Sequence, residues 1–378
     1  MSLEFAYANL LYCCEVWGEC GQGAENHDAT RTSLAAACTR VLDVHGAPGL
    51  YAIGELGLLN PTARMYSQRL AFWFDLLLQP STRYTRWTYQ CSLRAYNSGY
   101  GGITWCRATH AMLQHMGPPY TLAWAAGDVA RQRQWLANHM DEVLPSPSEL
   151  QDQSCYLRWR KRVRVAARHL VREWAEAQWR TAVATSHTLT LFARLHPYMR
   201  YARYLDSVHA PSATRLRARL RSGTYPLAEH MAYRRSGHDR DSQQYRMQAR
   251  CPLCGAPQET VAHFVLHCPR LAHARHGHTG VSLAATISAV CTHPVMLALL
   301  AQPQDHDDTL LALTLGGDLS DHPGLGLFMK PRSAANKHPG HPHPARDRLA
   351  ALHVTGDILI ALDRAREALL PTPRDGGA

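Results

Sequence analysis

The sequence has no apolar run long enough to span a membrane, and its first residues, with the acidic Glu4, have neither the basic segment nor the apolar core of a signal peptide. Segments of alternating polar and apolar residues are missing, and no internal repeat is visible. These absences argue against a membrane protein and predict a mostly α fold. The 11 cysteines are odd in number and scattered, without a disulfide framework, so we expect a reducing intracellular location, in the nucleus or the cytoplasm.

Acidic residues are the scarcer charged class. The chain has 30 Asp and Glu against 40 Lys and Arg, which gives a formal net charge of +10 and an isoelectric point near 9.2. This excess favours a polyanionic partner such as RNA or DNA, although solubility alone would also account for it. A length of 378 residues is enough for two or three modules with a sizeable core.

Four potential metal ligands form a C-x2-C-x8-H-x4-C array: Cys251, Cys254, His263 and Cys268. Three thiolates and one imidazole are a ligand set that a structural zinc ion takes in a closed tetrahedral site. Because the protein would fill all four positions, no position remains for a catalytic water. The array therefore predicts a structural Zn²⁺ ion.

The spacing within the array has a mechanical reason. Pro252 and Gly255 suit a tight turn that lets the first two cysteines face one point. Residues 259–267 are predicted to form a short helix that carries His263, and Pro269 suits the start of another helix after Cys268. A disulfide or inert core thiols are the alternatives to a metal site. His267 is a rival ligand, but it would leave the last two ligands adjacent in sequence.

Several helices are predicted from caps and periodicity. Asn60 and Pro61 start one in which apolar residues share a face and which ends before Pro80. Residues 157–180 form the most amphipathic one, with an apolar stripe opposite a basic stripe. One or two helices are expected in residues 281–301, and residues 346–370 form the last one. A Gly/Pro/His-rich segment, 318–344, is predicted to be a loop.

Basic residues cluster on the 157–180 helix and just before and within the metal array region. We predict that these side chains contact nucleic-acid phosphates, with little preference for sequence; the alternative is a solvated charged face. The candidates are Arg158, Arg160, Lys161, Arg164, Arg168, Arg172, Arg215, Arg217, Arg219, Arg221, Arg234, Arg235 and Arg250.

Four stretches follow one another in an order that is typical of a known family. They are Leu11-Tyr12 to Trp17-Gly18; Gly54-Glu55-Leu56-Gly57 with Arg69 to Trp73; Leu220-Arg221-Ser222-Gly223 with the array and Pro269; and Leu313 to Gly316 with Arg364 or Arg366 in the last helix. In this order they resemble the part of LINE-type (non-LTR) retrotransposon reverse transcriptases that follows the catalytic palm. The resemblance covers nearly the whole chain, and the array is its most specific part.

The resemblance implies a domain division and a function. Residues 1–60 would be a remnant of the reverse-transcriptase thumb, 61–205 a helical linker bundle, 206–280 the reverse-transcriptase zinc-binding domain and 281–378 a helical tail. In the family this region is implied to bind element RNA and target DNA. The palm aspartates that hold two metal ions are missing here, since Asp307-Asp308 follows no apolar strand, so we expect no enzyme activity from this chain alone.

Other functions are kept as alternatives. In the first alternative, the chain is a structural scaffold or an inert retroelement remnant that does not bind nucleic acid, and the zinc ion only holds its helices together. A Cys/His nucleophilic enzyme would need an oriented base and an open site, which no spacing suggests. A RING-type ligase would need two zinc sites. The missing polymerase portion of a parent protein is a further expected partner.

Overall fold

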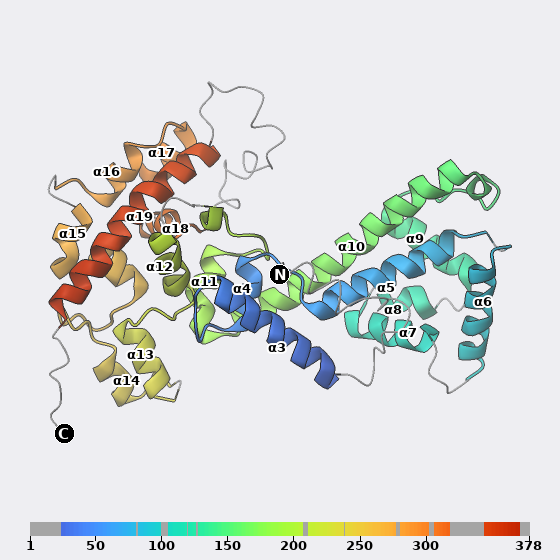
Figure 1. Ribbon diagram of the computed structural model, residues 1–378, viewed down its shortest axis with the longest axis horizontal. Coiled ribbons are helices and arrows are strands. Elements are labelled where there is room, and N and C mark those ends of the chain that lie inside the picture. Colours follow the sequence, from blue (N-terminus) through green and yellow to red (C-terminus); the bar gives the residue numbers. More distant parts are fainter. Residues whose placement is uncertain are drawn as a thin grey trace. The chain divides into compact units, whose positions relative to one another are not determined.

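The computed structural model describes residues 24–80, 82–99, 105–118, 120–125, 128–206, 211–237, 239–276, 280–301, 306–317 and 344–370. In these residues the secondary structure is helical, and the only strand-like pairing among them is the isolated bridge between Leu56 and Tyr201 (Figure 1). The predicted mostly α fold is therefore confirmed. The expected thumb stretch at 11–18 and nearly all of the 318–344 loop lie outside the described residues. None of the described helices combines the length and the apolar character needed to cross a bilayer.

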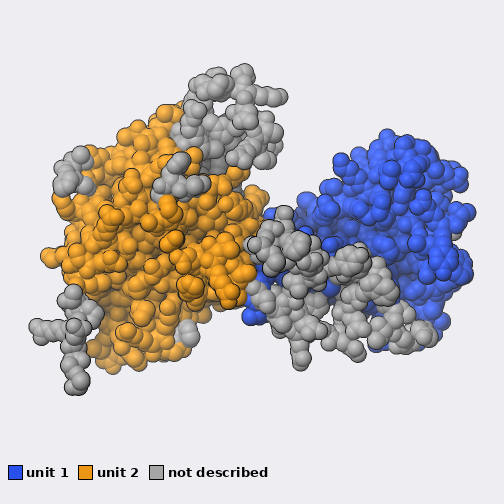
Figure 2. All heavy atoms as spheres, in the orientation of Figure 1, with its two compact units in different colours: residues 1–34, 59–179 blue, residues 35–58, 180–378 orange. Residues whose placement is uncertain are grey.

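The chain divides into two compact units, residues 1–34 with 59–179 and residues 35–58 with 180–378 (Figure 2). Helix α3 (Ala24–Val41) and helix α10 (Gln153–Ala184) each include a boundary between the units. The other helices of the first unit are α5 (Pro61–Leu78), α6 (Tyr84–Asn97), α7 (Trp105–Met116), α8 (Tyr120–Ala125) and α9 (Val129–Met140).

The second unit holds the remaining helices. They are α4 (Gly49–Glu55), α11 (Thr190–Leu195), α12 (Pro211–Arg221), α13 (Ala228–Arg235), α14 (Gln243–Gln248), α15 (Ala272–His276), α16 (Leu283–Ser288), α17 (Pro294–Ala301), α18 (His306–Leu315) and α19 (Pro344–Leu369), with a π-helical turn, η4 (His263–His267), and a 3-10 turn, η5 (Pro269–Leu271).

Helix α5 is the centre of the first unit. Its predicted start is confirmed, because the Asn60 side chain accepts a hydrogen bond of 2.7 Å from the backbone N–H of Ala63. Trp73 is fully buried among other aromatic rings, and its indole N–H donates to the Tyr89 hydroxyl at 2.9 Å. Tyr89 in turn donates to Gln132 at 2.7 Å. The predicted apolar face of this helix is thus core, and the Trp73 indole and the Tyr89 hydroxyl are paired across α5, α6 and α9.

A buried acid, Asp75, ties α5 to α10 within the first unit. Its carboxylate accepts hydrogen bonds from the Tyr156 hydroxyl at 2.8 Å and from the Arg160 guanidinium at 3.0 Å. The Arg164 guanidinium lies 3.7 Å from the same carboxylate. Since an unpaired buried carboxylate is costly, these three side chains have a structural task on α10.

The second unit is built around a buried ion pair that joins distant parts of the sequence. Arg221, at the end of α12, donates to the Glu55 carboxylate at the end of α4 at 2.5 Å, and both side chains have no exposed surface. Tyr204 donates to the same carboxylate at 3.3 Å, and the Leu315 carbonyl accepts from Arg221 at 3.2 Å. Three of the stretches that carry the family resemblance therefore meet in one hydrogen-bonded network.

Helix α19 is the central helix of the second unit. It contacts α12, α15, α16, α17 and α18 (Figure 1). Apolar residues of the array region and of these helices belong to one hydrophobic core. Residues 206–280 and the described part of 281–378 thus share a core, and the expected four-part division of the chain stays a prediction.

Gly57, which follows α4, lies so close to the backbone of residues 200 and 201 that a side chain there would clash. Gly57 has a φ of +61°, and a Cβ atom there would lie 2.7 Å from the carbonyl carbon of Arg200 and closer still to the Tyr201 nitrogen. Gly46 has a similar φ of +76° with nothing within 4 Å of such an atom, so it provides a matched control.

We expect Gly57→Ala to lower the free energy of unfolding by about 2–4 kcal/mol, because it adds a backbone clash to the cost of the left-handed conformation. Gly46→Ala carries only the conformational cost, about 1 kcal/mol. Denaturant titration of both variants measures the difference. Equal losses would contradict the close packing of Leu56 to Leu58 on the 200–202 segment.

Candidate metal centre

The four residues of the predicted array come together. One ligand atom from each of Cys251, Cys254, His263 and Cys268 lies within 4.8 Å of all the others. The sulfur atoms of Cys251 and Cys268 are 4.0 Å apart, and the Cys254 sulfur lies 3.3 Å from the His263 Nε2 atom. A tetrahedral zinc ion would place its ligand atoms about 3.5–3.8 Å apart, from bond lengths of about 2.3 Å to sulfur and 2.0–2.1 Å to nitrogen. The cluster therefore has the dimensions of a four-coordinate metal site.

The first two ligands lie on a tight turn. The Gly255 N–H donates to the Cys251 carbonyl at 2.9 Å, and the Cys251 N–H donates to the Ala256 carbonyl at 2.9 Å. Gly255 takes a φ of +75°, which confirms the left-handed conformation expected of it. The Cys251 sulfur also accepts hydrogen bonds from the backbone N–H groups of Leu253 and Cys254. Burial has the larger effect and raises the pKa of the Cys251 thiol, and these hydrogen bonds act in the opposite direction by stabilising the thiolate.

The other two ligands lie at the two ends of η4. The predicted 259–267 helix begins only at Val261 and widens into a π-helical turn at His263. In this turn the Cys268 N–H donates to the His263 carbonyl at 2.7 Å, a separation of five residues. Phe264 and Val265 are buried and anchor the turn in the core. Helix η5 begins after Cys268 with Pro269, as expected.

The alternative interpretations of the array do not fit the geometry. His267 is exposed, and its Nε2 atom forms an ion pair with Asp307 at 2.9 Å, so His263 is the histidine of the cluster. A disulfide needs a sulfur–sulfur distance of about 2.05 Å. The array cysteines are all free thiols, and the Cys251 and Cys268 sulfur atoms are 4.0 Å apart. The cluster can thus hold a metal ion.

Burial sets the ionisation of the ligands in the metal-free form. It raises the pKa of the Cys251 thiol to about 12 and also raises the pKa of Cys268. It lowers the pKa of His263 below its usual value, which keeps the imidazole neutral and able to ligate. A cation would therefore displace protons from the thiols when it binds.

Two buried arginines that the sequence reasoning missed brace this region. Arg275 donates to the carbonyls of Val265 at 2.7 Å and Cys268 at 3.1 Å, and so fixes the end of η4. Arg366, on α19, forms a bidentate ion pair with Glu259: its Nε and Nη2 atoms donate to the two carboxylate oxygens at 2.8 and 3.0 Å. The sequence identifies Arg366 only as one of two arginines in the last helix that contribute to the family resemblance. Its partner lies 107 residues away in the sequence, which no local pattern reveals.

Two of the predicted phosphate contacts are wrong. Arg217 and Arg221 are completely buried, so neither can reach a nucleic acid. Arg217 donates to the Thr314 carbonyl at 2.8 Å and to the Thr355 hydroxyl at 3.0 Å. Both arginines lie on the face of α12 that carries Leu216 and Leu220. That shared face is the signal in the sequence that could have identified them as core residues.

The other predicted contacts fall into two groups. Arg160 and Arg164 are half-buried and engaged with Asp75. The remaining side chains are exposed: Arg158, Lys161, Arg168, Arg172, Arg215, Arg219, Arg234, Arg235 and Arg250. Some of these also have protein partners, such as Arg215 with Asp43 at 3.5 Å and Arg234 with the Gly223 carbonyl at 2.9 Å.

Comparison with known proteins gives no relative. No family model matches the chain, and no curated protein and no solved structure is significantly similar to it.

Proposed function

We propose that the chain holds a structural zinc ion at Cys251, Cys254, His263 and Cys268 and binds RNA or DNA through exposed arginines and a lysine. The observation that carries the zinc assignment is the closed set of three soft sulfur ligands and one imidazole. This set suits zinc better than hard cations such as Mg²⁺ or Ca²⁺, which prefer oxygen ligands. Because protein fills every position, the ion would stabilise the fold and would not activate water.

The nucleic-acid part of the proposal is supported by α10. Its exposed cations Arg158, Lys161, Arg168 and Arg172 repeat at spacings of three, seven and four residues, which places them on one helical face. A row of cations along a helix suits contact with successive phosphates. Within the retrotransposon resemblance, this chain would be a catalytically silent, nucleic-acid-binding C-terminal piece in the nucleus or cytoplasm, working with a polymerase portion.

The scaffold alternative also has support. Arg160, Arg164, Arg217 and Arg221 are all held by protein partners, so four of the 13 basic residues predicted to contact phosphate serve the fold instead. If the remaining ones served only solubility, the zinc ion would brace an inert module.

Reversal of the α10 charges separates these two functions. We expect Arg158→Glu, Lys161→Glu and Arg168→Glu together to weaken RNA binding and to reduce the slope of log K against log salt by about 2, since each phosphate contact contributes about 0.7 on a single strand. Fluorescence anisotropy across a salt series measures both quantities. The matched control reverses Arg94, Arg203 and Arg246, which are also exposed. If both triple variants bind as the wild type does, the scaffold function is favoured.

A further inference from the structure

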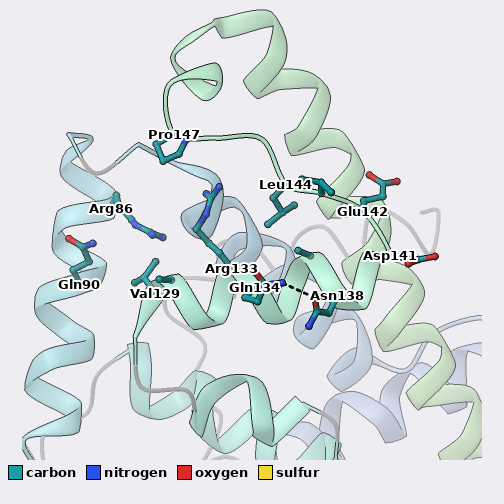
Figure 3. Close-up of a pocket in the computed structure, with 13 residues that line it drawn as sticks. Arg86, Gln90, Val129, Arg133, Gln134, Asn138, Asp141, Glu142, Leu144 and Pro147 are labelled. Carbon is teal, nitrogen blue, oxygen red and sulfur yellow. Dashed lines mark hydrogen bonds between the residues drawn. The ribbon is translucent and has the colours of Figure 1, made fainter.

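The first unit contains a cavity of about 850 Å³, well away from the array in sequence. It lies between α6, α9 and the segment after α9 (Figure 3). Two arginines line it, Arg86 from α6 and Arg133 from α9. Apolar side chains of Val129, Leu144 and Pro147 form other parts of the wall. The wall is thus mixed, with polar and charged side chains beside apolar ones, and its volume is within the range of small-molecule sites.

The two guanidinium groups are held by neutral backbone groups. Arg86 is only 5% exposed and donates to the Leu76 carbonyl at 2.7 Å, while its Nε atom has no hydrogen-bond partner among the described residues. Arg133 donates to the Leu77 carbonyl at 2.6 Å and to the Pro145 carbonyl at 2.7 Å. Carbonyls orient a guanidinium but do not neutralise it, so both positive charges remain.

No described carboxylate forms an ion pair with either arginine. Glu142, in the cavity wall, is paired with Arg162 at 3.1 Å, and Asp141 is exposed. Figure 3 shows both acids at the opposite end of the cavity from Arg86. Burial and then the nearby charge of Arg133 lower the pKa of Arg86 to about 10, which still leaves it protonated at neutral pH. Two uncompensated cations in one hollow favour an anion between them.

The sequence around the cavity strengthens this argument. Between Asp75 and Asp128 the chain has no acidic residue, while it has four arginines there, Arg83, Arg86, Arg94 and Arg107. The positive charge of Arg86, on the α6 side of the cavity, is therefore not balanced by any acidic residue between Asp75 and Asp128.

We propose that this cavity binds a phosphate monoester, with Arg86 and Arg133 as anchors for the phosphate and Val129, Leu144 and Pro147 against the organic group. Guanidinium groups match phosphate geometry better than other cations do, and the amides of Gln90, Gln134 and Asn138 in the same wall add hydrogen-bonding capacity. The monoester is either a free nucleotide or the 5′-phosphate end of a nucleic-acid strand. The site does not depend on the zinc ion or on the α10 cations.

Calorimetric titration of the whole chain at constant ionic strength tests the site. We expect adenosine 5′-monophosphate to bind, and adenosine, which lacks the phosphate, to bind at least about tenfold more weakly. Arg86→Gln and Arg133→Gln should each weaken binding of the monophosphate about tenfold or more, whereas Arg94→Gln, an exposed arginine of α6 outside the cavity wall, should not. Hydrogen exchange should slow on binding within residues 129–147.

Several results would overturn the proposal. They are no binding of the monophosphate at about 10 mM, equal binding of adenosine, or unchanged binding in both glutamine variants. If a glutamine variant does not fold, Arg86→Lys and Arg133→Lys replace it, because they keep the positive charge. The comparison of adenosine 5′-monophosphate with adenosine on the wild-type chain still tests the phosphate site. A 5′-phosphorylated oligonucleotide is then compared with the monophosphate. If the oligonucleotide binds more tightly and loses this extra affinity when its 5′-phosphate is removed, the ligand is a strand end. If the two ligands bind with equal affinity, the ligand is a free nucleotide.

Discussion

Chelation of the proposed zinc ion is expected to unfold residues 250–275 and to destabilise the core that they share with α12 and α16 to α19. The free energy of structural zinc binding is about 10–16 kcal/mol in small zinc modules, which is as large as the whole stability of a typical domain. Cys254→Ser should have the same effect as chelation. Cys254 is only half-buried, so its loss removes a ligand without opening a cavity in the core. Circular dichroism, hydrogen exchange and metal analysis of the purified chain measure the result.

Cys155→Ser is the matched control, because Cys155 is also a half-buried free thiol but lies on α10, in the part of that helix that belongs to the first unit. It should leave the melting curve unchanged, and the first unit should stay folded in the Cys254→Ser variant because it has its own core. A purified protein without zinc, together with a Cys254→Ser variant that melts like the wild type, would refute the metal site.

Arg221→Met is expected to lower the free energy of unfolding by about 3–5 kcal/mol, because it leaves the Glu55 carboxylate charged, buried and without its cation. The Tyr204 hydroxyl at 3.3 Å cannot replace a full positive charge. Chemical denaturation, monitored by fluorescence, measures the loss. Changing Glu55→Gln in the same background removes the unpaired charge and should restore a large part of the stability.

Arg219→Met serves as the control for the Arg221 substitution. Arg219 lies on the same helix but is exposed, with its guanidinium 5.6 Å from the Tyr225 ring centre. Its loss should cost no more than about 1 kcal/mol. If the two methionine variants were equally stable, the Arg221–Glu55 pair would not be a central contact of the second unit.

The metal cluster could be predicted from the sequence because its ligands are close together in the chain. Turn chemistry at Pro252 and Gly255 and the proline after Cys268 restrict the backbone enough for the spacing to predict the ligand set. The start of α5 was predictable for a similar reason, since Asn60 and Pro61 act on the next few residues. The π-helical form of η4 was not predicted, because no local pattern in residues 263–267 distinguishes it from an α-helical turn, and the core in which Phe264 and Val265 are buried is built by distant helices.

The buried arginines were mistaken for surface residues because a charge is usually on the surface. Arg217 and Arg221 have carbonyl and carboxylate partners from α4, α18 and α19, far away in the sequence. No window of local sequence contains both members of these pairs. Periodicity on α12 could have shown which arginines face inward, but not what they bind.

The second unit is split in the chain, because residues 35–58 and 180–378 belong to it, while residues 59–179, which lie between them, belong to the first unit. During synthesis, α4 therefore leaves the ribosome long before α12 or α18, the helices that complete its surroundings. The first unit can fold in the meantime, whereas the Glu55 side chain gains its partners Tyr204 and Arg221 only when the chain is 149 and 166 residues longer. A chaperone that shields an apolar segment would protect α4 in this interval, and slow translation between residues 59 and 179 would lengthen it.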